Sequence, residues 1–273
     1  MDLAAIIRGE TYNLHTHTQF CDGHAEMEQF VKAAIEHGIA NLGFTPHSPL
    51  PFHTPCNMEK EAVDTYFTEI ARLRKEYGEK LHIYASMEID YLDEWGPDNN
   101  YFASLPLDYR IGSVHFIPTP DDDGAYVDID GKPERFEENM HKVFGNDVEW
   151  VVRKFYEQSL KMIEKGGFDI VGHLDKVGYN ASVFRRGIDG EPWYDALVRR
   201  EIEAIMDFGY IVEINTKSWE NHGRMFPDVR YWELLKRWNA PLVVNSDAHY
   251  PELINAGRDY ALKELGLKNA NRL

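Results

Sequence analysis

Cysteine, basic residues and long apolar runs are all scarce in this 273-residue chain. Two cysteines, Cys21 and Cys56, are too few for the disulfide framework of a secreted protein of this length. Lys and Arg total 29 against 46 Asp and Glu, a formal net charge of -17 that repels nucleic acid and anionic membranes. No apolar run approaches the roughly 20 residues that span a bilayer, and no basic and then apolar leader opens the chain. We therefore expect a cytoplasmic protein without nucleic-acid or membrane partners.

Short apolar runs recur along the chain, and helical patterns separate them. The seven predicted strands are 11–15, 41–45, 81–88, 109–115, 168–173, 210–215 and 241–246. The predicted helices are 25–37, 59–77, 148–165, 193–208, 229–238 and 251–265. Strands that alternate with helices are typical of a parallel sheet, and this number of units closes naturally into a barrel. The pattern therefore predicts an α/β fold built as a seven-stranded (β/α)7 barrel.

One domain suffices for the whole chain, 1–273, because α/β barrels commonly reach this size without splitting. The main interruption of the pattern is the polar segment 117–146, which contains "TPDDDGAYVDIDGKPE". We expect it to form a loop and a helix that pass over one face of the barrel rather than a second domain.

Side chains that commonly bind metals follow the predicted strands where each one ends. Six of the chain's twelve histidines are among them. The residues are His15, His17, His47, Glu88, His115, His173, Asp247 and His249. A single His at a strand end is more often a hydrogen-bonded structural residue, but in a parallel barrel all these strand ends meet at one mouth. So many imidazoles and carboxylates would be poorly stabilised there without a cation.

The ligand types indicate which metals would bind. Imidazole and carboxylate suit Zn, Fe or Mn, whereas a structural zinc finger or an iron–sulfur cluster would need a group of cysteines. The number of ligands exceeds one tetrahedral ion, so we expect two or three divalent metal ions, with Glu88 able to bridge two of them. A multinuclear site of this kind serves hydrolysis.

The strand-end motifs occur in a distinctive order: "HTHT", "FTPHSPL", "ASMEID", "GSVHF", "VGHLDK", "EINT" and "NSDAH". This order resembles the polymerase and histidinol phosphatase (PHP) family over about residues 12 to 257. The runs "HTHTQFC" and "HSPLPF" resemble the histidinol-phosphatase branch of the family. The resemblance implies a distorted seven-stranded barrel with a trinuclear metal centre at the carboxyl ends of its strands.

The resemblance also implies which residues hold each metal. His15, His17, Glu88 and Asp247 would bind the first, and Glu88, His115 and His173 the second. The third would take His47, His249 and one residue from the loop after "HTHT". Most family members place an Asp there, which is Asp22, and some phosphatases use a His, so His24 remains the alternative. We interpret Cys21 as a residue that packs beside the site rather than as a ligand.

The activity implied by the resemblance is that of a metal-dependent phosphomonoesterase, a histidinol-phosphatase that converts L-histidinol phosphate to L-histidinol and phosphate in histidine biosynthesis. We expect a metal-bridging hydroxide to attack phosphorus, with Glu88 between the metals and Asp247 or His249 passing a proton to the leaving alkoxide. Fixed cations should hold the phosphate. The candidates are Arg224, which resembles a phosphate-binding Arg of the branch, and then Lys217 and Lys176.

Other functions remain open at this stage. The same chemistry could act on another small phosphomonoester, a nucleotide or a phosphodiester end, although the acidic chain lacks a basic groove for long nucleic acid. An amidohydrolase would need a bridging Lys, which no predicted strand end supplies. A non-enzymatic metal-binding domain would be expected to have a degenerate ligand set. The oligomeric state cannot be read from these patterns.

Overall fold

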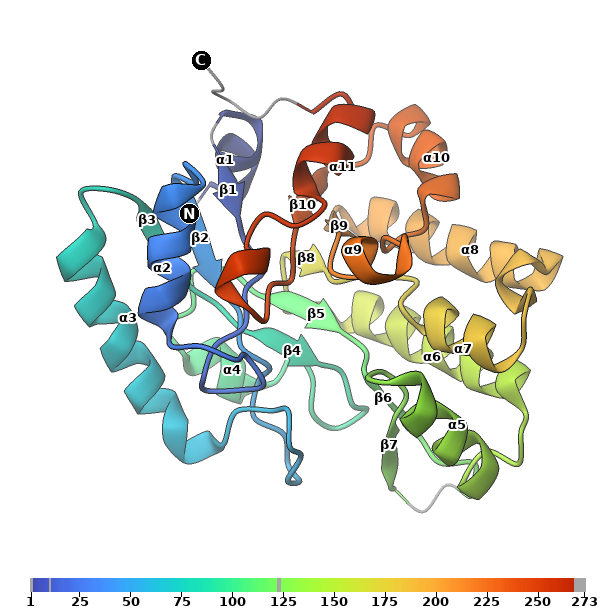
Figure 1. The fold of residues 1–273 in the computed structure, drawn as a ribbon. Helices are drawn as coiled ribbons and strands as arrows, with labels where there is room; N and C mark the ends of the chain where they lie inside the picture. The colour runs from blue at the N-terminus through green and yellow to red at the C-terminus, as the bar shows by residue number, and fades with distance from the viewer. Residues whose placement is uncertain (1, 10, 122–123, 268–273) are drawn as a thin grey trace.

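Two parallel sheets lie at the centre of the computed structural model, which describes residues 2–9, 11–121 and 124–267 (Figure 1). The three-stranded sheet has the order β1–β2–β3, with β1 at Tyr12–Asn13, β2 at Asn41–Phe44 and β3 at His82–Ala85. The five-stranded sheet has the order β10–β9–β8–β5–β4, with strands Leu242–Asn245, Ile211–Asn215, Ile170–Val171, Ile111–Ser113 and Glu88–Asp90. Every neighbouring pair in both sheets is parallel, which confirms the α/β fold.

Helices surround these strands, as Figure 1 shows. The helices of the first half are α1 Leu3–Gly9, α2 Met27–Glu36, α3 Val63–Tyr77 and α4 Asn100–Ser104. Those of the second half are α5 Pro133–Lys142, α6 Val148–Lys165, α7 Val177–Phe184, α8 Pro192–Phe208, α9 Trp219–His222, α10 Trp232–Arg237 and α11 Arg258–Glu264. In the part of the chain that the structure describes, none of these helices combines the length and apolarity needed to cross a membrane.

The predicted strand 81–88 is divided into two strands in different sheets. β3 pairs with β2, whereas β4 pairs with β5. The hydroxyl of Tyr66 enters the ladder at this point, where it donates to the carbonyl oxygens of Phe44 and Ser86. Pro46 follows β2 and has no N–H to continue the pairing. Beyond this break, a single parallel bridge between His47 and Glu88 connects the two sheets.

The polar excursion contains more regular structure than a loop and a helix. An antiparallel ribbon precedes α5, with β6 at Phe116–Pro118 and β7 at Tyr126–Asp128. The loop part of the prediction was therefore wrong at 116–118 and 126–128, where consecutive residues of two short strands pair in antiparallel register. Asp122 and Asp123, which come between β6 and β7 in the sequence, lie outside the described residues. The predicted helix of the excursion is present as α5, which buries Phe136 and Met140.

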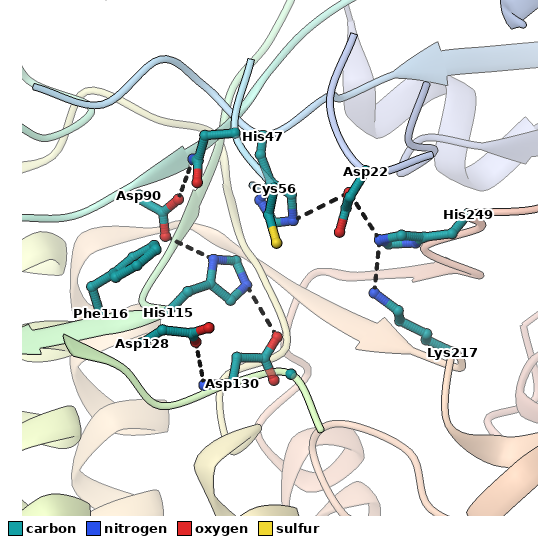
Figure 2. Close-up of a pocket in the computed structure, with 12 residues that line it drawn as sticks. Asp22, His47, Cys56, Asp90, His115, Phe116, Asp128, Asp130, Lys217 and His249 are labelled. Atoms are coloured by element: carbon teal, nitrogen blue, oxygen red, sulfur yellow. Dashed lines mark hydrogen bonds and ion pairs between the residues drawn. The ribbon is translucent and has the colours of Figure 1, made fainter. Parts of the chain in front are cut away.

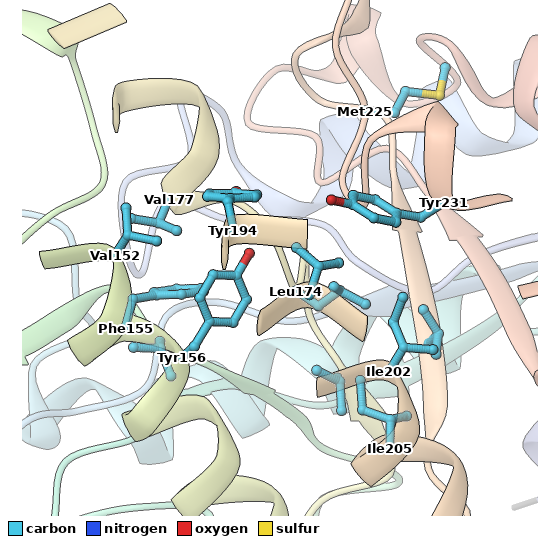
Figure 3. Close-up of a cluster of buried hydrophobic side chains, with 14 of the residues drawn as sticks. Val152, Phe155, Tyr156, Leu174, Val177, Tyr194, Ile202, Ile205, Met225 and Tyr231 are labelled. Carbon is cyan, nitrogen blue, oxygen red and sulfur yellow. The ribbon is translucent and has the colours of Figure 1, made fainter. Parts of the chain in front are cut away.

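The larger apolar core lies where α6 and α8 cover the five-stranded sheet. Helix α8 follows the predicted segment 193–208 closely: it starts at Pro192, whose missing N–H costs nothing in the first turn, and ends at Gly209 with a φ of 77°. Its inner face buries Val198, Ile202 and Ile205, which recur at helical spacing. Figure 3 shows two of these residues packed with side chains of α6 and of the β8–α7 region.

One buried carboxyl interrupts this apolar contact between helices. Glu201 of α8 is fully buried and accepts a hydrogen bond from the hydroxyl of Ser159 on α6. Burial raises the pKa of Glu201 well above its ordinary value of 4.5. The folded state therefore keeps a proton that the unfolded state releases as the pH rises.

Glu201→Gln should reduce the pH dependence of the free energy of unfolding. Stability from the protonated Glu201 is fully present below pH 4.5 and is lost as the pH rises through the raised pKa of the folded state. Since Gln has no such proton, its stability relative to wild type should rise by about 1.4 kcal/mol per pH unit across that interval. Urea unfolding from about pH 5 to about pH 8 measures this, with the exposed Glu203→Gln on the same helix as control. Parallel pH profiles for wild type and Glu201→Gln would contradict the prediction.

Candidate metal centre

The carboxyl ends of strands from both sheets meet at one buried space. Parallel strands place their carboxyl ends at the same edge, so residues far apart in sequence come together there. The structure brings together all nine predicted ligands: His15, His17, Asp22, His47, Glu88, His115, His173, Asp247 and His249. All of them are buried except Asp22, whose side chain is 28% exposed.

The first group contains His15, His17 and Asp247. His17 Nε2 lies 2.9 Å from Asp247 Oδ1, and His15 Nε2 lies 3.7 Å from the same oxygen. Both Nε2 atoms are 3.4 Å from Glu88 Oε2. Two imidazoles and two carboxylates thus face one point.

The second group forms around the other oxygen of Glu88. Glu88 Oε1 lies 2.7 Å from His173 Nε2 and 3.6 Å from His115 Nε2. The Nε2 atoms of His115 and His173 are 3.2 Å apart. Because its two oxygens face different groups, Glu88 has the geometry of a bridging residue.

The third group contains Asp22, His47 and His249, together with His17. Asp22 Oδ1 is 3.3 Å from His249 Nε2 and 3.8 Å from His47 Nε2. It is also 3.3 Å from His17 Nδ1. His24, the alternative to Asp22, is exposed and stacks on the ring of Tyr250, with centroids 4.3 Å apart. Only Asp22 of the two therefore faces the group.

Carboxylates behind the histidines orient their rings. Glu213 Oε1 lies 2.7 Å from His15 Nδ1, and Asp90 Oδ1 lies 2.7 Å from His115 Nδ1. His249 Nδ1 donates to the backbone oxygen of Asp247 over 3.0 Å. Each of these bonds uses Nδ1 and leaves Nε2 for the centre, the arrangement that fixes the tautomer of a metal-binding imidazole. Asp90 was not predicted from the sequence, although its place two residues after Glu88 on the same strand was a usable signal.

The donor atoms at the centre fit bound cations. Several buried atoms that point into it have no hydrogen-bond partner among the described residues: His15 Nε2, His17 Nε2, Asp22 Oδ1, His47 Nδ1 and Glu88 Oε2. A buried polar atom without a partner is destabilising. Metal coordination would satisfy these atoms, and nitrogen and carboxylate donors in overlapping groups fit a centre with several metals.

The pKa values reflect an excess of carboxylate at one side of the centre. Burial by itself lowers the pKa of His15, but Glu213, Asp247 and Glu88 outweigh it and raise that pKa to about 10. On the other side, burial together with the charges of His17 and Lys217 lowers the pKa of His249 to about 3. His249 therefore stays neutral, the form that binds metal, while the carboxylates beside His15 favour a cation.

The backbone is unusual at two of the strand ends. His173 has a φ of 23° and Asp247 a φ of 48°, values that residues other than Gly rarely adopt. Such conformations are concentrated at functional sites, where surrounding contacts hold them. At Asp247 the holding contact is the side-chain amide of Asn215, which donates to Asp247 Oδ2 over 3.1 Å.

The three predicted phosphate-binding cations lie in different places. Lys217 Nζ is 3.1 Å from His249 Nε2, at the edge of the centre. Lys176 Nζ pairs with Asp130 Oδ2 at 2.8 Å. Arg224 pairs with Asp189 and lines neither cavity described below, so its role in phosphate binding stays a prediction without a contact to support it.

A cavity of about 160 Å³ opens onto the third group of ligands (Figure 2). Residues not predicted from the sequence complete its wall: Cys56, Asn57, Asp90, Phe116, Asp128, Asp130 and Gly131. A second cavity of about 230 Å³ shares Asp130, Gly131 and Lys217 with it. Cys21 lies outside both linings, with its Sγ 3.5 Å from His17 Nδ1. Three of these seven residues, Asp128, Asp130 and Gly131, come from the excursion, whose position over the site carries no local sequence signal.

Comparisons with known proteins identify a family and relatives for this chain. The family model described as the PHP domain matches residues 13–217. The histidinol-phosphatase of Bacillus subtilis is 28% identical, with 86% of this chain and 92% of that protein covered. A Schizosaccharomyces pombe protein named "Probable histidinol-phosphatase" is 26% identical, over 91% of this chain and 83% of that protein.

Two solved structures share the fold. The hisK structure from Listeria monocytogenes has a TM-score of 0.81 at 22% identity, covering 92% of this chain and 99% of that one. Histidinol phosphate phosphatase from Lactococcus lactis, in complex with Zn, L-histidinol and phosphate, has a TM-score of 0.68 at 21% identity, with 95% of both chains covered.

Asp22→Asn should weaken one metal site, whereas His24→Ala should leave metal content unchanged. The reason is that Asp22 Oδ1 lies among three imidazoles while His24 stacks outside the centre. Metal-to-protein ratios by plasma mass spectrometry, after dialysis against limiting Zn or Mn, measure the difference. Loss of metal from His24→Ala with full retention by Asp22→Asn would reverse the assignment.

Proposed function

The chain belongs to the PHP domain family, and from this premise we propose that it is a metal-dependent phosphomonoesterase that hydrolyses L-histidinol phosphate. The observation that carries the proposal is the convergence of three ligand groups, with several buried inward atoms that have no hydrogen-bond partner among the described residues. Relatives named histidinol-phosphatase align along most of the chain and support the choice of substrate.

Within this proposal each ligand group would hold one divalent ion. His15, His17 and Asp247 would bind the first, and Glu88 would contribute to the first and to the second. His115 and His173 would complete the second site. Asp22, His47 and His249 would bind the third. His47 lies between two of these sites, because its Nδ1 is also 3.2 Å from Glu88 Oε2.

We further propose that the seven strand positions form one distorted barrel within a single domain. An isolated parallel bridge between Thr16 and Ala248 links the end of β1 to the end of β10. The bridge between His47 and Glu88 links β2 to β4 on the other side. The buried guanidinium of Arg258 supports the closure, because it donates to the carbonyl oxygens of Tyr12 and Val244 on the first and last strands.

Bound metal ions and Lys217 would have different roles in the reaction. When bound, divalent ions supply positive charge for the phosphoryl oxygens and lower the pKa of water. Lys217 adds an ammonium at the rim, where it can contact a phosphate oxygen. Its Nζ lies 3.1 Å from His249 Nε2 and 3.5 Å from Asp247 Oδ1. Because His249 is neutral and the pKa of Asp247 is held well below its ordinary value, Lys217 is the group of these three that holds a proton for the leaving alkoxide, and Asp247 or His249 would relay it.

Metal removal should abolish phosphate release from L-histidinol phosphate, and added Mn, Zn or Fe should restore it. Without bound cations the inward carboxylates repel a phosphate dianion, and neutral imidazoles do not compensate for that repulsion. Turnover after exhaustive chelation, and again after readdition of each metal, measures this. Circular dichroism of the chelated protein controls for unfolding. Full activity in a protein shown to contain no metal would end the proposal.

The substrate is tested by a phosphate-release screen. L-histidinol phosphate should exceed sugar phosphates, nucleotides and a phosphodiester in kcat/KM by more than about tenfold, the discrimination that one or two modest contacts provide. A smaller preference would reject L-histidinol phosphate as the specific substrate. The proposal of a phosphoesterase would then still hold, with the best substrate of the screen in place of L-histidinol phosphate.

A further inference from the structure

Among the described residues that line the metal-site cavity, Asp128 is the aspartate without an ion pair, although the charges of His115 and Arg135 act on it from a greater distance. Of the other three aspartates in the lining, Asp22 faces the third ligand group, Asp90 bonds to His115 and Asp130 pairs with Lys176. Asp128 Oδ1 accepts a hydrogen bond from the backbone N–H of Asp130 over 2.8 Å. Across the ranges 2–9, 11–121 and 124–267, its carboxylate forms no ion pair with a Lys, Arg or His side chain.

An aromatic ring lies directly beside this carboxylate. Phe116 of β6 and Asp128 of β7 are paired residues of the antiparallel ribbon, so their side chains project from the same face. Both line the cavity, as Figure 2 shows. The ring of Phe52 meets Phe116 edge to face, with centroids 5.7 Å apart, and holds it in place. The excursion thus presents an apolar ring and an anionic group side by side.

The two adjoining cavities differ in charge. The second cavity is lined by Lys132, Lys176 and Lys217, whereas Lys217 is the one lysine among the described residues that line the first. A ligand with a phosphate at one end and a positive charge at the other would therefore place its phosphate toward Lys217. Its cationic end would lie toward Asp128, which pairs with none of these lysines, whereas Asp130 already pairs with Lys176.

We infer that Phe116 and Asp128 form the subsite that binds the leaving group of the substrate, and that this subsite selects a primary ammonium next to a flat ring. The inference rests on the proposed function and extends it to specificity. L-histidinol carries both features, an ammonium and an imidazole. Asp128 pairs with the ammonium, and the ring packs on Phe116.

The environment of Asp128 disfavours its negative charge, as expected of a carboxylate that binds a cationic ligand. Burial and the neighbouring charge of Asp130 raise the pKa of the Asp128 carboxyl above its ordinary value. The charges of His115 and Arg135 lower this pKa without forming an ion pair with the carboxylate, and a bound ammonium in direct contact would offset burial and the charge of Asp130 further. A substrate without a cationic group gains nothing from this contact.

Kinetics with matched substrates test the subsite. In Asp128→Asn the amide oxygen can still accept the hydrogen bond from Asp130, so that the turn is kept and only the charge is lost. The ratio of kcat/KM for L-histidinol phosphate to that for phenyl phosphate should fall about 10- to 100-fold, the usual effect of losing a charged hydrogen bond. Glu137→Gln, an exposed residue of the same excursion, removes the same charge outside the cavity and should leave the ratio unchanged. An unchanged ratio in Asp128→Asn would overturn the inference.

The ring contact has its own comparison. Phe116→Leu should lower kcat/KM for L-histidinol phosphate several-fold more than for O-phosphoethanolamine, which has the ammonium but no ring. An equal effect on both substrates would remove Phe116 from the subsite.

Binding of the product alone separates this inference from the proposed function. Calorimetric titration of L-histidinol into the Zn-loaded protein should show dissociation constants about 10- to 100-fold larger for Asp128→Asn than for wild type. If wild type binds L-histidinol through Asp128 but does not hydrolyse its phosphate, the subsite stands and the proposed function fails. If wild type hydrolyses the phosphate and Asp128→Asn binds L-histidinol as tightly as wild type does, the function stands and the subsite is wrong.

Discussion

Imidazoles and carboxylates share one buried space at the strand ends, and most other features near the site depend on this crowding. Water cannot screen the carboxylates of Glu88 and Asp247 there, since both are fully buried. The surrounding protein compensates with hydrogen bonds directed at individual atoms. Glu213, for example, accepts bonds from His15 Nδ1, from the side chain of Asn245 and from the backbone of His173. These hydrogen bonds use the outward atoms of the side chains, so that the inward atoms remain available and the positions where cations can bind are fixed.

The closure of the fold serves the same arrangement. The first and last strands carry ligands of the same group, His15 and His17 on one and Asp247 on the other, so their relative position decides the geometry. Buried polar bonds hold them together: the side chain of Asn13 donates to Ser246 Oγ over 2.7 Å, and Leu14 N donates to Asn245 Oδ1 over 2.8 Å. Polar contacts of this kind are directional, unlike apolar packing, and so they set strand register as well as strand proximity.

Positive side chains on this side of the molecule pair with particular aspartates. Lys176 neutralises Asp130 and Arg224 neutralises Asp189, while Lys217 remains at the rim beside His249. A strongly acidic protein can attract a phosphate only through local fields, and these pairs decide where the field is positive. The ribbon of β6 and β7 contributes Phe116 and Asp128 to the same cavity, so in our proposal it shapes the side of the site that faces the leaving group.

The sequence by itself determined the alternation of strands and helices and the ligand types at the strand ends, because parallel strands leave only one edge at which those side chains can meet. It could not determine the choice between Asp22 and His24, which lie two residues apart in one loop and differ only in the direction that the folded loop gives them. Nor could it place Arg224 against Asp189 or the ribbon of Phe116 and Asp128 over the cavity. These positions result from contacts between distant segments, and local patterns of hydrophobicity and charge carry no record of such contacts.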